Sequence, residues 1–129
     1  MPHTWVGSDF IRSTMDMFAY DREADSALVV GAGVPAAWAS SGDGVVVRAM
    51  RTPFGPLDLT VRSAGDSAHV AVGGSGMRMP PGGVVVRSPR GGTPRAVTVN
   101  GAAAQSAPAG DGAEVVVRRL PAVVVFRYR

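Results

Sequence analysis

The sequence has 129 residues, a length that suits one domain with a core of its own. It contains no cysteine, which excludes disulfide bonds and thiolate metal ligands. The formal net charge is +3, but the arginines are scattered and form no basic stripe with aromatic neighbours, so we expect no nucleic-acid partner.

The chain also lacks the usual signals for membranes. No apolar run reaches the length of a membrane span, and the first residues do not show the charged and apolar regions of a signal peptide. We therefore expect no membrane partner, and the cellular compartment stays open.

A helical pattern occurs only near the N-terminus. Ser8 or Asp9 can cap a helix, and large apolar residues follow at spacings of three, four and seven. These residues are Phe10, Ile11, Met15 and Phe18. The pattern predicts an amphipathic helix that ends near Arg22.

From residue 27 onward the pattern becomes that of β-strands separated by glycine and proline turns. Leu57, Leu59 and Val61, for example, alternate with polar residues, as in a half-buried strand. Strands are predicted at 27–30, 45–50, 57–61, 69–72, 84–87, 97–99, 114–118 and 122–128. We therefore predict a mainly β protein, an antiparallel β-sandwich of jelly-roll type preceded by one N-terminal α-helix.

Two short segments carry sharper local signals. Asn100-Gly101 follows a strand, and this dipeptide is the strongest short-range signal for a two-residue hairpin turn. Pro35 suits the first position of a helix, so we expect a single helical turn through Trp38.

The segment Gly31–Ala36 loosely matches a dinucleotide-binding loop. Such a loop needs a long helix that crosses back to a parallel strand, but the next predicted strand begins at Val45. The expected acidic residue about twenty positions on is also missing. We interpret the glycines as a tight turn and expect no cofactor.

Metal and nucleophile motifs are missing as well. His3 and His69 are the only histidines, no spacing suits a metal site, and no serine lies in a nucleophile elbow. The alternation around His69 places it on a solvated strand face. We therefore expect no metal ion.

The carboxylates of the predicted helix do not form a catalytic pair. Asp9 and Asp16 are seven residues apart, about 10.5 Å along a helix axis, on one exposed face without a cleft. We interpret them as a cap and a surface charge. Trp5 and Trp38 offer flat faces that could stack on sugars, although single tryptophans more often act as core or interface anchors.

Residues 3–61 resemble the end of a six-hairpin, (α/α)6-barrel glycosidase. His3–Asp9 resembles the loop before the last barrel helix, and Phe10–Tyr20 resembles that helix. Leu28–Trp38 resembles the exit from the barrel, a short strand followed by a proline-led turn that ends in tryptophan. Gly44–Val61, centred on Thr-Pro-Phe-Gly-Pro, resembles the first hairpin of a C-terminal β-sandwich.

The resemblance implies a division into two units and a weak substrate site. Residues 1–25 would be the terminal helix of a truncated α-helical barrel, and residues 26–129 the C-terminal β-sandwich. Rhamnosidases and inverting disaccharide phosphorylases share this order of elements and use barrel carboxylates as acid and base. No glutamate lies in residues 1–20, so we expect no catalytic residue here, and only His3, Trp5 and Asp9 would line the mouth of the active site.

Two functions remain open. The chain is either the non-catalytic, accessory C-terminal part of a glycoside hydrolase-like enzyme, with the upstream helical barrel as its partner, or a freestanding β-sandwich that binds a glycan or a protein. Because the sequence begins inside a motif, we expect a longer parent chain. The broad apolar face of the predicted helix would then lack its barrel neighbours, so we also expect self-association through that helix.

Overall fold

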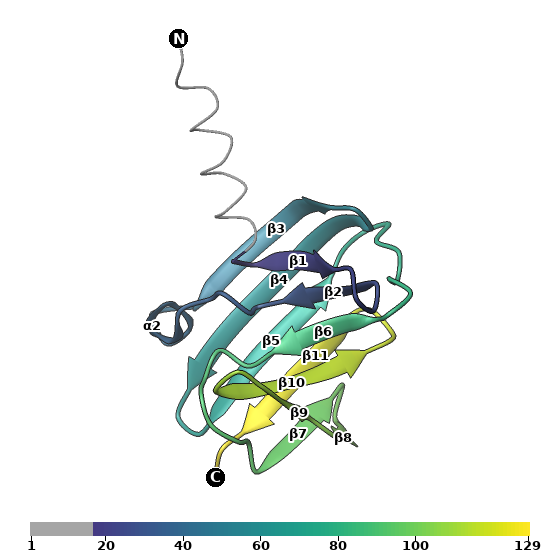
Figure 1. Ribbon diagram of the computed structural model, residues 1–129. Coiled ribbons are helices and arrows are strands. Elements are labelled where there is room, and N and C mark those ends of the chain that lie inside the picture. Colours follow the sequence, from purple (N-terminus) through teal and green to yellow (C-terminus); the bar gives the residue numbers. More distant parts are fainter. Residues whose placement is uncertain (1–16) are drawn as a thin grey trace, which may run out of the picture.

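Short strands bounded by glycine and proline turns fill residues 17–129, the part of the chain that this computed structural model describes (Figure 1). The strands form two sheets that face each other. The first, the five-stranded sheet, consists in spatial order of β1 (Ala19–Arg22), β2 (Ala27–Val30), β6 (Val84–Arg87), β10 (Gly112–Val117) and β9 (Ala107–Ala109).

The second sheet, the six-stranded sheet, lies behind the first in Figure 1. It consists in spatial order of β3 (Val45–Thr52), β4 (Gly55–Ala64), β5 (Ser67–Gly73), β11 (Ala122–Arg127), β7 (Ala96–Val99) and β8 (Ala102–Ala104). The pairings are antiparallel except for the parallel pair of β2 and β6. A one-turn helix, α2 (Ala36–Ala39), joins the two sheets between β2 and β3.

The core lies between the sheets, and several strands of both sheets turn alternate side chains toward it. Leu57, Leu59 and Val61 of β4 are at most 1% exposed, while the residues between them are only half-buried. β5 and β11 repeat this alternation, and Phe126 is the largest fully buried side chain. The predicted mainly β sandwich is thereby confirmed.

The predicted helix is wrong over its last residues. Ala19–Arg22 form strand β1, which pairs with β2, so that Ala19 lies opposite Val30. This pairing satisfies backbone groups of both strands and buries Ala19 in the core, which outweighs a weak local helix preference. Part of the predicted helical unit 1–25 thus contributes a strand to the sandwich. Met17 and Phe18, also predicted as helix, lie in a turn instead, and Phe18 packs against the core of the sandwich. The helix residues before Met17 lie outside the described part of the chain.

The two short segments form the turn and the single helical turn that the sequence predicts, although the helical turn is shifted by one residue. Asn100 and Gly101 have φ values of 51° and 85° and join β7 to β8, with Val99 opposite Ala102. The Asn100 side chain also accepts a hydrogen bond of 2.8 Å from the Val123 backbone N–H, which fixes the turn to β11. The single helical turn is present as α2, but Pro35 is its N-cap with an extended ψ of 141°, so the helix begins at Ala36, one residue later than expected.

Candidate functional site

The substrate-binding residues predicted from the sequence lie outside the part of the chain that the structure describes. His3, Trp5 and Asp9 all lie outside residues 17–129, as does Asp16. Their grouping at the mouth of an active site therefore stays a prediction. His69, in contrast, lies within the described residues. It is half-buried on β5, where the residues before and after it are fully buried, and its Nε2 lies 3.3 Å from Ser67 Oγ.

Trp38 stands beside an open depression of about 350 Å³. The depression is lined by Trp38, Ser41, Gly44 and Val45. Trp38 is 48% exposed, the largest side chain with an exposed face in the described part of the chain. The site thus offers a flat aromatic face next to a serine and exposed backbone, and it contains no ionisable side chain.

Local structure explains why Trp38 points outward. Val34 and Ala39 belong to the core and anchor the two ends of the helical turn, at 6% and 1% exposure. The Trp38 backbone N–H donates to Pro35 O at 3.0 Å. With both anchors buried, the intervening turn keeps Trp38 on the solvent side. Gly44 must be glycine here, because its φ is 79° and a Cβ would collide with Val61 O.

The Gly31–Ala36 loop is a tight turn, as interpreted from the sequence. Gly31 has a φ of 81°, and its N–H donates to Phe18 O at 2.8 Å. Gly33 lies so close to Met17 that a Cβ would fall 2.8 Å from Met17 Cα. The strand that follows, β3, belongs to the opposite sheet, so the loop does not start a parallel crossover.

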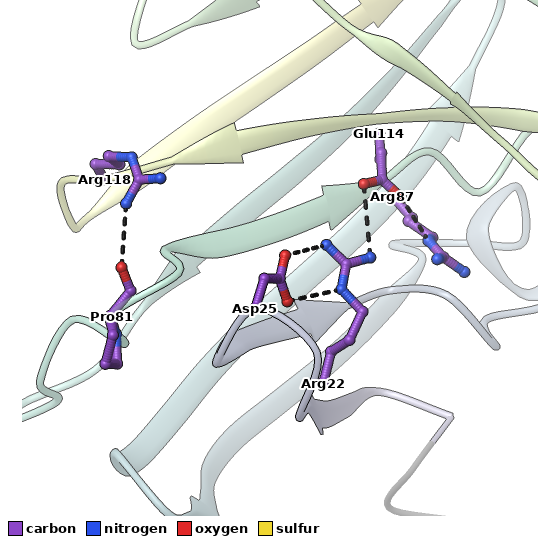
Figure 2. A network of polar contacts seen from close by, with 6 residues as sticks. All are labelled: Arg22, Asp25, Pro81, Arg87, Glu114 and Arg118. Atoms are coloured by element: carbon purple, nitrogen blue, oxygen red, sulfur yellow. Dashed lines mark hydrogen bonds and ion pairs between the residues drawn. The ribbon is translucent and has the colours of Figure 1, made fainter.

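A charge network crosses the outer face of the five-stranded sheet (Figure 2). Arg22 donates from Nε to Asp25 Oδ1 at 2.9 Å and from Nη2 to Asp25 Oδ2 at 2.7 Å. Glu114 lies 3.8 Å from Arg22 Nη1 and accepts from Arg87 Nε at 3.2 Å. The network therefore links the edge strand β1 to β10, across β2 and β6.

The same outer face carries a second apolar cluster. Leu28 and Val30 of β2 face the core, so Ala27 and Val29 point to the other side of the sheet. There they join Val85 of β6, and all three are completely buried. Tyr20 packs against this cluster, and the arginines and Glu114 of the network lie on the same face. Arginine side chains have long apolar stems, which can pack on apolar surface while their charged ends remain in water.

The paired charges shift each other's ionisation. The hydrogen bond to Asp25 raises the pKa of Arg22 above its ordinary value, against a smaller opposing effect of desolvation. The hydrogen bond from Arg22 in turn lowers the pKa of Asp25 below 3.8. The side chains are 30% and 46% exposed, so solvent screens the pair and limits its contribution to stability.

A depression of about 200 Å³ lies on the outer face of the six-stranded sheet. It is lined by Arg48, Asp58, Thr60, Ala71, Val72, Gly73, Pro121, Ala122 and Val123. Sequence reasoning did not single out Arg48 or Asp58. The alternation of Leu57–Val61 did place Asp58 and Thr60 on the outward face, and that was the available signal.

The structure also bears on metals and membranes. Among residues 17–129, no three histidine or acidic side chains gather as they would around a metal ion. None of the helices in the described part of the chain combines the length and apolar character needed to cross a bilayer.

Comparisons with known proteins give no family for this chain. The sequence matches no protein-family model and no curated protein, and the fold matches no solved structure at a significant level.

Proposed function

We propose that this chain is an accessory, non-catalytic β-sandwich domain of a carbohydrate-active enzyme. Its role is to hold sugar on the ring of Trp38 and to pack against an upstream helical barrel that supplies the catalytic acid and base. The proposal joins the resemblance of residues 3–61 to six-hairpin glycosidases with the surface around Trp38.

The exposed ring of Trp38 beside its depression is the observation that carries the proposal. A volume of about 350 Å³ falls at the lower end of the range of ligand sites, roughly 300–1,000 Å³. Aromatic rings supply a large, flat apolar surface, and Ser41 adds a hydroxyl that can bond to a sugar hydroxyl. Because Val34 before α2 and Ala39 at its end are buried in the core, the ring stands on a turn that is anchored on both sides.

The lining of the two depressions supports a binding role more than catalysis. Hydrolysis of a glycosidic bond generally requires two carboxyl groups across the bond. The depression at Trp38 has no carboxylate in its lining, and the depression on the six-stranded sheet has only Asp58. We therefore expect no turnover of aryl glycosides by the isolated chain. Turnover that disappears in Asp9→Asn or Asp16→Asn would contradict this assignment.

Calorimetric titration with a panel of neutral oligosaccharides tests the proposed sugar site. Trp38→Ala should abolish binding, whereas Trp38→Phe should keep part of it because a flat ring remains. Val116→Ala is the matched control, since Val116 is also 45% exposed but lies on β10, on the opposite sheet from β3. Failure of every sugar to bind, or equal binding by Trp38→Ala, would refute the sugar site.

A protein partner at the same place is the second candidate function. Trp38 is 48% exposed, and aromatic residues are enriched in the cores of protein–protein interfaces. This alternative predicts that Trp38→Ala weakens association with the helical domain of the parent chain and leaves sugar titrations unchanged. Sedimentation of the two domains mixed together would show it.

A further inference from the structure

The depression on the six-stranded sheet has the form of a short trough. Its centre is formed by small residues of two neighbouring strands: Thr60 on β4, and Ala71 and Gly73 on β5. Larger groups flank it, with Arg48 of β3 on one side and Val123 of β11 on the other. The trough therefore runs along β4 and β5, between raised side chains.

A β-bulge positions the charged end of this trough. The register of β3 against β4 shifts between Val47 and Met50, and Ala49 within the shift has a φ of 54°. This φ is strained for a residue with a side chain, so other contacts must hold it. The Ala49 N–H donates to Asp58 Oδ1 at 2.8 Å, which fixes both the bulge and the carboxylate.

The two charged side chains that line the trough, Arg48 and Asp58, form no ion pair with each other. Arg48 is exposed and forms no ion pair with any carboxylate in the described part of the chain. Asp58 uses one oxygen for the bulge, which leaves its other oxygen as an acceptor. This is the opposite of Arg22 and Arg87, whose guanidinium groups are both paired.

We propose that this trough binds a sugar that carries a carboxylate, such as a uronic acid unit of an acidic polysaccharide. Arg48 would hold the carboxylate, because a guanidinium matches that group in charge and in its two-pronged geometry. The free oxygen of Asp58 would accept hydrogen bonds from the ring hydroxyls. The Thr60 hydroxyl would donate a hydrogen bond to a ring oxygen. Val123 and Pro121 would contact the apolar face of the ring.

A sugar fits this trough better than an acidic peptide does. An acidic side chain of a peptide offers acceptor oxygens alone and gives Asp58 no donor, whereas a uronic acid ring carries hydroxyls beside its carboxylate that can donate to Asp58. The volume of about 200 Å³ also limits the occupant to a small group such as one sugar ring. The inference extends the proposed carbohydrate function to a second site with a different chemistry.

The test is a calorimetric titration of the full chain with trigalacturonate and with its methyl ester. The acid should bind at least about tenfold more tightly than the ester, because only the acid forms charge-assisted hydrogen bonds. Arg48→Gln should remove this difference. Arg127→Gln is the matched control, since Arg127 is exposed on the same face of β11, four residues beyond Val123, and is absent from the lining.

Each contrary outcome has a defined meaning. Equal affinity for acid and ester, or an equal loss in Arg48→Gln and Arg127→Gln, would overturn the proposed contact with Arg48. Tighter binding of triglutamate than of trigalacturonate would show that the trough takes a peptide. Trp38→Ala separates this inference from the proposed function. If that variant loses neutral sugars while the wild type shows no preference for the acid, the proposal for Trp38 stands and only the proposal for the trough is refuted.

Discussion

The outer face of the five-stranded sheet buries its apolar side chains on β2 and β6, whereas the outer face of the six-stranded sheet leaves apolar side chains in solvent. Val29 and Val85 on the first face are completely buried. Val46 and Val123 on the second are 50% and 44% exposed. Val116 on β10 also lies on the first face but is 45% exposed, so the burial on this face does not extend to all of β10.

The two faces differ in how their charges are arranged. On the five-stranded sheet, Glu114 joins Arg22 and Arg87 (Figure 2), and this network lies on the same face as the apolar cluster of Ala27, Val29 and Val85. On the six-stranded sheet, Arg48 and Asp58 line a depression and form no ion pair with each other. Charges paired with each other close a surface, and charges left without partners keep it available to a ligand.

The largest expected effect compares a covered valine with an exposed one. Val29→Ala should destabilise the fold by about 2 kcal/mol, because it removes buried methyl groups and leaves a cavity. Val123→Ala should change the unfolding free energy by less than about 0.5 kcal/mol, since Val123 is already half in water. Urea unfolding of both variants measures the difference. Similar losses in the two would mean that the faces do not differ in burial.

A smaller loss of stability is expected when the charge network on the first face is disrupted. Glu114→Gln should cost about 1 kcal/mol, because it removes the charge from its contacts with Arg22 and Arg87. Asp58→Asn on the other face is the matched change. Its effect should be near zero, since the asparagine Oδ1 can still accept from the Ala49 N–H. A larger loss in Asp58→Asn would reverse the proposed roles of the two carboxylates.

The smallest expected effect is the pH dependence of the Arg22–Asp25 pair. The pKa of Asp25 is lower in the folded chain than its ordinary value of 3.8. Its stabilising effect is therefore complete above pH 3.8 and is lost as the pH falls through the lower folded value. Asp25→Asn should remove this part of the acid sensitivity in urea unfolding between pH 5 and 2. An unchanged acid profile in this variant would show that the pair does not contribute.

Local patterns predicted most of the strands. Alternation in Leu57–Val61 identified both β4 and its buried face, and valine runs between turns identified β2 and β6. The weakest local signals were missed. β8 and β9 consist of alanine and one proline, residues with low strand preference, and they form strands because β7 and β10 offer partners.

The candidate sites divide in the same way. Trp38 was recognised as a sugar platform or an anchor, but the sequence could not show that its face would be exposed. That exposure depends on the burial of Val34 and Ala39 in the shared core. Arg48 and Asp58 were not recognised, because only the bulge at Ala49 and the pairing of β3 with β4 bring them to one trough.

The sequence by itself determined the features that depend on neighbouring residues. The Asn100-Gly101 turn follows from two adjacent residues that tolerate positive φ, and the two-sided strands follow from a period of two. The tertiary structure alone decided that Ala19–Arg22 would become a strand and which outer face would close. Both outcomes depend on the strand order β1-β2-β6-β10, which brings Arg22 close to Glu114. Contacts between segments so far apart in the chain leave no local pattern in the sequence.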